Sequence, residues 1–258
     1  MIERYYDAVP RSAARVEEIG PFTLFVGTGA WPYYARPRLG LTHDFTVAEI
    51  AAVRERQREL GVPEAFEWVD ETTPSLLAAA VEAGLEVMQA PLMVLDGAVP
   101  ATVPDGVTVR MIEADDPALA ASVSAQDRGF GGTGEGVEAR VQFMRERLRS
   151  GVTRQAIAES ADGVLSVGAH QPVGDVTEIV GVSTVPEARR RGLAGAVTAA
   201  LVADAAAALV AERASTAPGG GELVAAPGPV VFLSAGEDAA RVYGRLGFER
   251  RGTACIVG

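Results

Sequence analysis

The sequence predicts an α/β (α+β) chain in which amphipathic helices alternate with short β-branched strands. Start and stop signals of helices recur along the chain, and apolar runs too short for helices lie between them. With 48% hydrophobic and 22% charged residues, the chain also has the composition of a globular protein that buries a core. Its 258 residues leave room for one large domain or two small ones.

The first half predicts helix, strand, helix and strand in that order. A capping box, Thr46-Val-Ala-Glu49, opens the first helix, and Gly61 ends it. Pro74 starts the second helix, and Gly84 ends it. The expected elements are a helix over 46–60, a strand over 65–69, a helix over 74–83 and an extended run over 85–95.

The second half predicts a longer series with the same ending. Its elements are a strand over 107–112, helices over 116–130 and 135–149, hairpin strands over 156–159 and 164–170, a strand over 176–185, a helix over 193–212, a strand over 230–233, a helix over 238–246 and an extended run over 248–257. A shift of 163 positions lays residues 83–94 over residues 246–257. Duplication and chance both account for this faint repeat. We expect the biased linker over 216–229 to be mobile.

Charge argues against a nucleic-acid partner. All 23 basic residues are arginine, 34 residues are acidic, and the formal net charge is −11. A nucleic-acid-binding protein needs a basic face, which this composition does not favour.

Composition also argues against a metal site, a disulfide and a membrane span. Cys255 is the single cysteine, and the two histidines, His43 and His170, are far apart in the sequence. The start of the chain lacks the apolar segment of a signal peptide. The most apolar stretch, 192–211, contains Thr198 and Asp204, so we interpret it as a packed helix. We therefore expect a cytoplasmic protein without a metal or a membrane-spanning segment.

The most informative segment is a strand that leads into a glycine-containing turn and a helix start. The strand over 176–185 ends at Pro186, and Arg189-Arg-Arg-Gly192-Leu-Ala-Gly195 follows. The first amides of a helix have no internal partner and bind phosphate, helped by the helix dipole. The alternative is a solvated arginine cap with glycines that only form the turn. The dinucleotide-binding fingerprint is not met, because its third glycine and its distant acid are missing.

Two motifs resemble those of the GNAT N-acetyltransferases. Arg189-x-x-Gly192-x-Ala194 after a strand is similar to the acetyl-CoA signature of that family, and residues 239–248 resemble its second motif. The strand over 107–110 with the acidic pair 115–116 is similar to its opening. The resemblance covers residues 107–258 and implies the acyl-CoA N-acyltransferase fold, a mixed and largely antiparallel sheet flanked by helices. It also makes residues 1–100 a shortened, degenerate GNAT-like domain in a tandem arrangement.

The resemblance implies acetyl-CoA as cosubstrate and a set of residues that bind it. The pantetheine arm would pair with the edge of the strand over 176–185, as an added strand does. The implied backbone contacts are Ser183, Thr184 and Val185, and the implied pyrophosphate site comprises Arg190, Arg191, Gly192, Leu193, Ala194 and Gly195.

Two residues match catalytic positions of the family. Tyr243 lies where many members carry the tyrosine that protonates the departing thiolate, and Glu178 lies where many carry a base. Core packing is the alternative for Tyr243, which belongs to an apolar helical face, and a solvated strand end is the alternative for Glu178. By alternation we expect Glu178 to share a face with Val180 and Val182. Gly236 replaces an asparagine common in the family, and we expect Asp238 to cap the helix there.

Two functions remain open at this point. The first is transfer of an acetyl or short acyl group to a primary amine of a small molecule or peptide, by direct attack in a ternary complex. The alternative is a non-catalytic acyl-CoA-binding protein that has lost its acceptor site. We expect the first half to bind no cofactor, because the stretch 31–45 before its first helix has no Arg-x-x-Gly-x-Ala turn. At the 163-residue offset Ala80, which cannot donate a proton, stands in the place of Tyr243. The sequence leaves a homodimer open.

Overall fold

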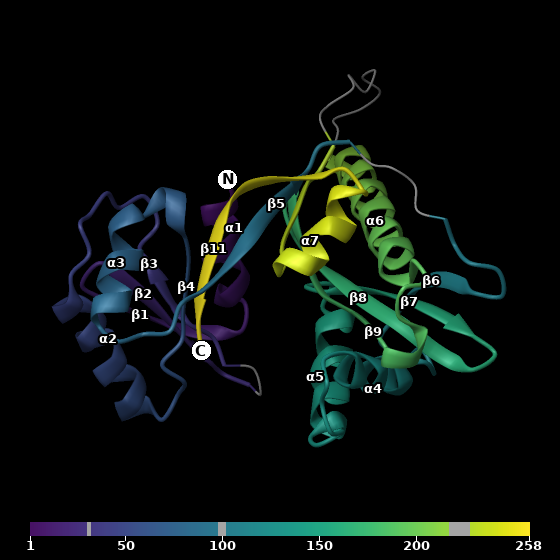
Figure 1. The fold of residues 1–258 in the computed structure, drawn as a ribbon, viewed down its shortest axis with the longest axis horizontal. Coiled ribbons are helices and arrows are strands. Elements are labelled where there is room, and N and C mark those ends of the chain that lie inside the picture. The colour runs from purple at the N-terminus through teal and green to yellow at the C-terminus, as the bar shows by residue number, and fades with distance from the viewer. Residues whose placement is uncertain (30–31, 98–101, 217–227) are drawn as a thin grey trace. The chain divides into compact units, whose positions relative to one another are not determined.

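A computed structural model describes residues 1–29, 32–97, 102–216 and 228–258, so the predicted linker lies almost wholly outside the described residues. The chain forms two compact units (Figure 1). Unit 1 comprises Met1–Met93 with Ser234–Ala240 and Arg250–Gly258. Unit 2 comprises Val94–Leu233 with Arg241–Glu249. The end of the chain therefore belongs to the unit that the start of the chain builds.

Unit 1 is a sheet with helices, and the C-terminal strand is part of it. Its elements are α1 (Ile2–Arg11), β1 (Ala14–Ile19), β2 (Phe22–Gly27), β3 (Ala35–Pro37), α2 (Val47–Leu60), β4 (Phe66–Val69), η1 (Asp70–Thr72), α3 (Pro74–Glu82), β5 (Met88–Leu95) and β11 (Phe248–Val257). Its strands follow the order β1-β2-β3-β4-β11-β5. β3 and β4 are parallel, whereas β1–β2, β2–β3 and β4–β11 are antiparallel.

The helices and strands predicted over 46–95 are confirmed with small shifts of their ends. Thr46 caps α2, its Oγ1 accepting from the amide of Glu49 (3.4 Å), while a Glu49 carboxylate oxygen accepts from the amide of Thr46 (2.9 Å). Among the described residues, one α-helix and three strands precede α2, whereas two α-helices and four strands of the second half precede the helix predicted over 193–212. The first half is therefore shorter by one strand and one helix.

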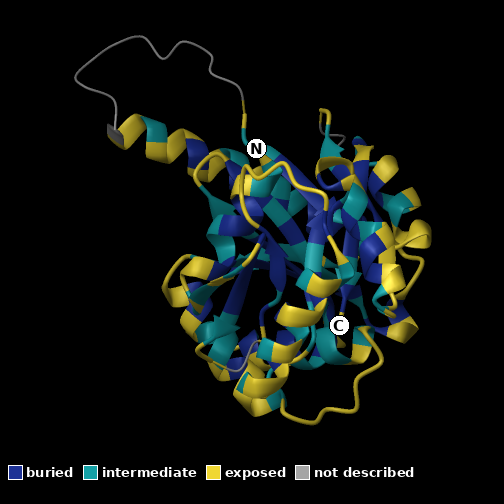
Figure 2. Ribbon diagram, turned by 90° about the vertical axis from the view of Figure 1, so that its left-hand side faces the viewer, coloured by how far each residue is buried: buried dark blue, intermediate teal, exposed yellow. Residues whose placement is uncertain are grey.

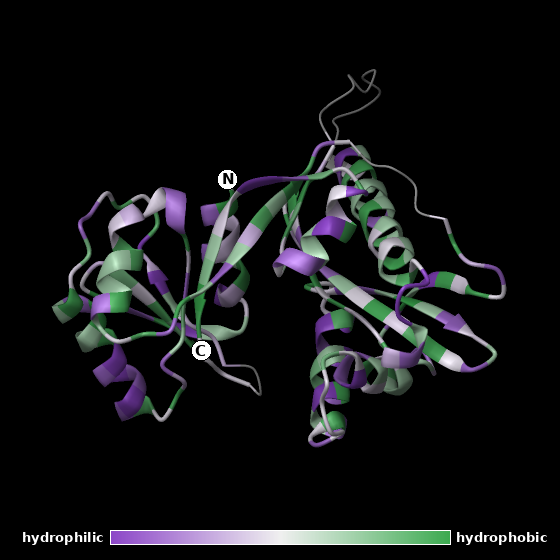
Figure 3. Ribbon diagram, viewed as in Figure 1, coloured by the Kyte–Doolittle hydropathy of each residue, from purple (hydrophilic) through white to green (hydrophobic). Residues whose placement is uncertain are grey.

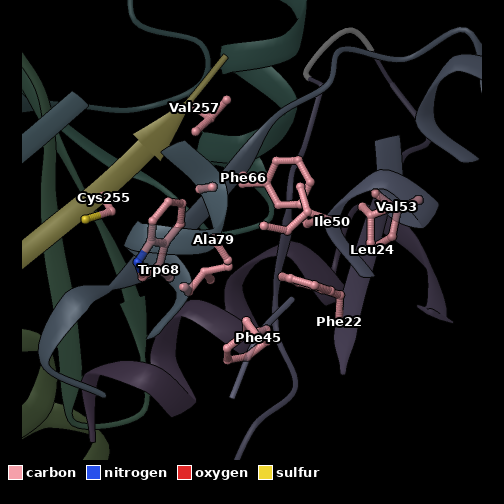
Figure 4. Close-up of a cluster of buried hydrophobic side chains, with 13 residues drawn as sticks. Phe22, Leu24, Phe45, Ile50, Val53, Phe66, Trp68, Ala79, Cys255 and Val257 are labelled. Atoms are coloured by element: carbon pink, nitrogen blue, oxygen red, sulfur yellow. The ribbon is translucent and has the colours of Figure 1, made fainter. Parts of the chain in front are cut away.

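The core of unit 1 lies between one sheet face and the helices α2 and α3 (Figure 4). Phe66 and Trp68 alternate with Glu67 along β4 and point to the same face, where Phe66 meets Phe22 edge to face at 5.8 Å. Cys255 and Val257 of β11 complete this cluster, so the last strand of the chain is needed to close the first unit.

Unit 2 carries the segment that the sequence singles out. Its elements are β6 (Thr108–Ile112), α4 (Leu119–Gly129), α5 (Val137–Arg149), β7 (Arg154–Ser160), β8 (Gly163–Val173), β9 (Val176–Thr184), η2 (Pro186–Ala188), α6 (Leu193–Thr216), β10 (Val230–Ser234) and the end of α7 (Glu237–Gly244). The strands follow the order β10-β9-β8-β7-β6. β6 to β9 pair antiparallel, and β9 and β10 pair parallel. The predicted fold class, a mixed and largely antiparallel sheet flanked by helices, is confirmed.

Helices cover both faces of this sheet. α4 and α5 lie on one side and α6 on the other (Figure 1). By length and composition, Leu193–Ser215 could cross a membrane, but α6 packs against β7, β8 and β9 through residues such as Val197 and Leu201. Most residues of α6 are hydrophobic (Figure 3), and exposed residues recur along its C-terminal turns (Figure 2).

Candidate functional site

The strands β9 and β10 are paired only at their beginnings. Val176 lies opposite Val230, and the last pair of the ladder is Glu178 with Phe232. β9 continues to Thr184, so in the described part of the chain its residues Ile179–Thr184 have an edge without pairing to β10. This edge offers backbone amides and carbonyls to an extended, amide-bearing molecule.

A β-bulge interrupts the same stretch of β9. Val180 pairs with Ala169 and Ser183 with Val167, so Gly181 and Val182 together oppose a single residue of β8. Gly181 has φ +62°, a left-handed conformation that glycine adopts without strain.

The bulge corrects one expectation about side-chain faces. Thr177 binds His170, which binds Asp204 of α6, so Thr177 faces α6 and Glu178 faces the opposite side with Val180. The predicted common face of Glu178 and Val182 is wrong: a Cβ at Gly168 would lie 2.9 Å from Val182 and 3.0 Å from Val197 of α6. Because the extra residue shifts the alternation, Val182 faces α6.

The bulge places Ser183 on the face of the sheet that α4 covers. A Cβ on Gly129, the last residue of α4, would lie 2.7 Å from Ser183 Oγ, so Ser183 faces α4, as Glu178 does. Ser183 Oγ is buried and has no hydrogen-bond partner among the described residues. A bound polar group that reached this hydroxyl would remove the cost of leaving it unpaired.

The turn after β9 leads into the first amides of α6. Arg190 (φ +63°) is the only described residue other than glycine with a positive φ, and Gly192 has φ +82°. The first intrahelical bond runs from the amide of Ala196 to the carbonyl of Gly192 (3.1 Å), so the amides of Leu193–Gly195 precede it. Left-handed residues next to a helix start form a concave group of amides that favours anions.

The three arginines of the turn have different positions. Arg189 donates to the carbonyls of Thr184 (3.3 Å) and Gly129 (2.8 Å), and it thereby fastens the turn to the end of α4. Arg190 and Arg191 are exposed beside the helix start. This segment thus combines a strand edge that is not paired to β10, a set of helix-start amides and two exposed arginines, which together suit an extended, amide-bearing molecule with an anionic group.

The structure brings Glu178, Ser183–Val185 and Arg190–Gly195 together on one strand–turn–helix segment, whereas Tyr243 comes from α7. Tyr243 is 8% exposed and meets Phe248 edge to face at 5.9 Å. Burial raises the pKa of Tyr243 to about 12, so its phenol stays protonated at neutral pH. Asp238 is not the cap of α7: it lies in the first turn, and the carbonyl of Gly236 accepts the first intrahelical bond, from Ala240 (2.9 Å).

The other candidate nucleophile, Cys255, and the candidate metal ligand His170 are both buried in the fold. The pKa of Cys255 is raised to about 12, mainly by burial, which keeps the thiol protonated. His170 is fully buried between Thr177 Oγ1 (2.8 Å) and Asp204 Oδ2 (3.0 Å), and Arg154 also binds Asp204. Within the described ranges, no three His, Cys, Asp or Glu side chains form a group that could hold a metal.

Sequence reasoning missed the contribution of α4. Gln126 and Gly129 contact β9, and Arg128 pairs with Glu187. One signal was present in the sequence: Gly181 is an isolated glycine in a β-branched strand, a pattern that indicates a bulge or a close approach.

The corresponding helix start in unit 1 is closed by its own side chains. The strand β3, the helix α2 and the parallel strand β4 repeat the order of β9, α6 and β10. At the start of α2, however, the amide of Glu49 already donates to Thr46 Oγ1, and the Glu49 carboxylate lies at the helix start. A negative group at this position disfavours a phosphate.

Comparisons with known proteins support the fold. No family model matches the sequence, and no curated protein matches it. A solved structure described as "GCN5-related N-acetyltransferase from Kribbella flavida" is 20% identical, with a TM-score of 0.69 over 99% of this chain and 94% of that chain. A tandem GNAT protein from the clavulanic acid biosynthesis pathway is 16% identical, with a TM-score of 0.59 over 92% of this chain and 77% of that chain. A GCN5-related N-acetyltransferase-like protein from Streptococcus suis is 13% identical, with a TM-score of 0.56 over 99% and 96%.

These neighbours match nearly the whole chain, including both units. The resemblance that the two motifs predict is therefore confirmed for the fold, including its tandem form. The chain has the fold of the GNAT N-acetyltransferases.

Proposed function

We propose that the protein is an acetyl-CoA-dependent N-acetyltransferase that transfers an acetyl or short acyl group to a primary amine. The observation that carries the proposal is the edge of β9 from Ile179 to Thr184, unpaired to β10, which leads directly into the helix-start amides of α6. A strand edge followed by an anion-binding helix start has the two features that an acyl-CoA needs, for its amide-bearing arm and for its pyrophosphate.

In this proposal the donor lies along β9 and ends at the first turn of α6. Backbone groups of Ser183, Thr184 and Val185 bind the arm, and the amides around Gly192 bind the pyrophosphate. The two exposed arginines, Arg190 and Arg191, add positive charge there. Leu193, Ala194 and Gly195 supply the remaining helix-start amides.

The chemical step is direct attack in a ternary complex. The amine nitrogen attacks the thioester carbonyl carbon, a C–N bond forms, and the C–S bond breaks. Glu178 takes the proton from the amine, directly or through water, and Tyr243 gives its proton to the departing thiolate. The Tyr243 phenol is protonated at neutral pH, as a proton donor must be before the reaction, while the burial that raises its pKa makes it a weaker acid.

The first unit is assigned no donor site in this proposal. Its capped helix α2 carries a carboxylate where a phosphate would bind, and Ala80 stands where unit 2 has Tyr243. One acetyl-CoA should therefore bind per chain. The acceptor is a small molecule or a peptide with a primary amine, and a cytoplasmic location would give access to acyl-CoA.

A panel of primary amines tests the proposal, with release of free CoA as the readout. The expected result is amine-dependent release above the rate of acetyl-CoA hydrolysis for at least one class of amine. Acetyl-CoA binding without release for any class would favour the non-catalytic binding protein. Absence of acetyl-CoA binding to the wild-type chain would refute both.

A further inference from the structure

Gln126 of α4 binds the strand at its bulge. Its side-chain amide donates to the carbonyl of Gly181 at 2.8 Å. A Cβ at Gly181 would lie 2.5 Å from the Gln126 side-chain nitrogen, so the glycine is needed both for its φ of +62° and for this approach. A bulge leaves a residue out of the regular ladder, and Gln126 supplies a partner for its carbonyl.

The contact has a consequence for the surrounding side chains. The bulge reverses the alternation of β9 after Val180, and it thereby places Ser183 on the same face as Glu178. Without the extra residue, Ser183 would face α6, and the edge amides that follow would turn with it. The hydrogen bond from Gln126 therefore holds the bulge that decides which way the side chains and edge amides at the end of β9 point.

We propose that Gln126 is a positioning residue, which holds the bulge of β9 in the shape that accepts the acyl-carrying arm of the donor. This inference rests on the proposed function, since it names how the same site is shaped. It makes a specific distinction: loss of the Gln126 donor should affect the arm that lies along β9 and spare the diphosphate, which lies beyond Thr184.

Two variants of Gln126 and one control test the inference. Gln126→Met keeps the length of the side chain and removes the donor. Gln126→Glu is nearly isosteric and turns the donor into an acceptor, except when its carboxyl is protonated. Gln142→Glu makes the same change on α5, where Gln142 is exposed and accepts from Arg145. The probes are acetyl-CoA and ADP, which carries a diphosphate but no pantetheine arm, and dissociation constants are measured by calorimetry on the full chain.

At pH 8 we expect both Gln126 variants to weaken acetyl-CoA binding about tenfold, the effect of leaving a carbonyl without its partner, and to leave ADP binding unchanged. The loss in Gln126→Glu should shrink relative to wild type at pH 5, because a protonated carboxyl can donate to Gly181. The loss in Gln126→Met should not change with pH, and Gln142→Glu should behave as wild type.

Acetyl-CoA affinities within twofold of wild type in both Gln126 variants would overturn the inference. Equal weakening of ADP and acetyl-CoA would also overturn it, since it would indicate a general structural role. A wild-type chain that fails to bind acetyl-CoA would instead refute the proposed function, so the two failures are distinguishable.

Discussion

Gly129 ends α4 against β9, and Gly129→Ala should force these two elements apart. The added Cβ would lie 2.7 Å from Ser183 Oγ, 2.8 Å from Ser183 Cβ and 3.2 Å from the amide nitrogen of Thr184. Carbon atoms in contact normally lie about 3.5–4.0 Å apart. A rotation of the Ser183 hydroxyl would relieve only the first contact, because the other two atoms move only with the strand.

Two opposing effects set the magnitude. Alanine is favoured over glycine in a helix by about 0.5–1 kcal/mol, and overpacking a tight contact costs about 1–3 kcal/mol. The overpacking should outweigh the gain in helix propensity, with a net loss of about 1–2 kcal/mol in the free energy of unfolding. Gly244 is a matched control: it ends α7, and a Cβ there would meet nothing within 4 Å. Gly244→Ala should leave stability unchanged or raise it slightly.

Urea unfolding followed by circular dichroism checks this expectation. Gly129→Ala should lower the midpoint by roughly 0.5 M, given a slope of about 2–3 kcal/mol per molar urea. A Gly129→Ala chain as stable as wild type would show that α4 does not press on β9 in solution.

Three further predictions concern titratable groups. Tyr243→Phe should lower the turnover number by about 100-fold and leave acetyl-CoA affinity unchanged, because a proton donor acts mainly in the transition state; wild-type turnover would assign Tyr243 to core packing. Burial raises the pKa of Glu67 to about 7 despite the nearby Arg36, so the folded state keeps a proton that the unfolded state has lost above its own pKa of about 4.5. Stability should therefore fall as the pH rises from 4.5 through 7, and Glu67→Gln should abolish this component of a pH-dependent melting series; identical pH profiles for the two proteins would contradict it. The pKa of His170 is lowered, mainly by burial, so the folded state favours the neutral imidazole. The free energy of unfolding should therefore decrease as the pH falls below about 6.5, where the unfolded chain takes up this proton. His170→Gln should remove this decrease from the same melting series.

The elements with strong local signals were predictable from the sequence. The capping box at Thr46 and the glycine at Gly61 gave both ends of α2, and the strand–turn–helix around Gly192 was found with nearly correct bounds. Each of these features depends on residues within a few positions of one another, which is why a sequence pattern reveals them.

Features that depend on distant partners were not predictable. β3 has only three residues, and its Arg36 is buried because Glu3, far away in sequence, pairs with it and Tyr6 stacks on it at 5.1 Å. The pairing of β11 with β4 joins two segments that are far apart in the sequence. The isolated Gly181 signals a bulge, but the hydrogen bond from Gln126 to its carbonyl joins distant positions, and no local periodicity reveals that contact.

The most direct test of the donor site is a calorimetric titration of acetyl-CoA into wild type, Gly192→Asp and Gly192→Asn. A Cβ at Gly192 would meet nothing within 4 Å, and Asp and Asn both tolerate its φ of +82° better than other side chains, so both variants should keep the fold. They differ mainly in the carboxylate that Asp would place beside the pyrophosphate. Wild type should bind one acetyl-CoA per chain, Gly192→Asn should bind more weakly, and Gly192→Asp should not bind detectably. Wild-type affinity in Gly192→Asp, or two equivalent sites per chain, would contradict the assignment of the donor site to β9 and α6.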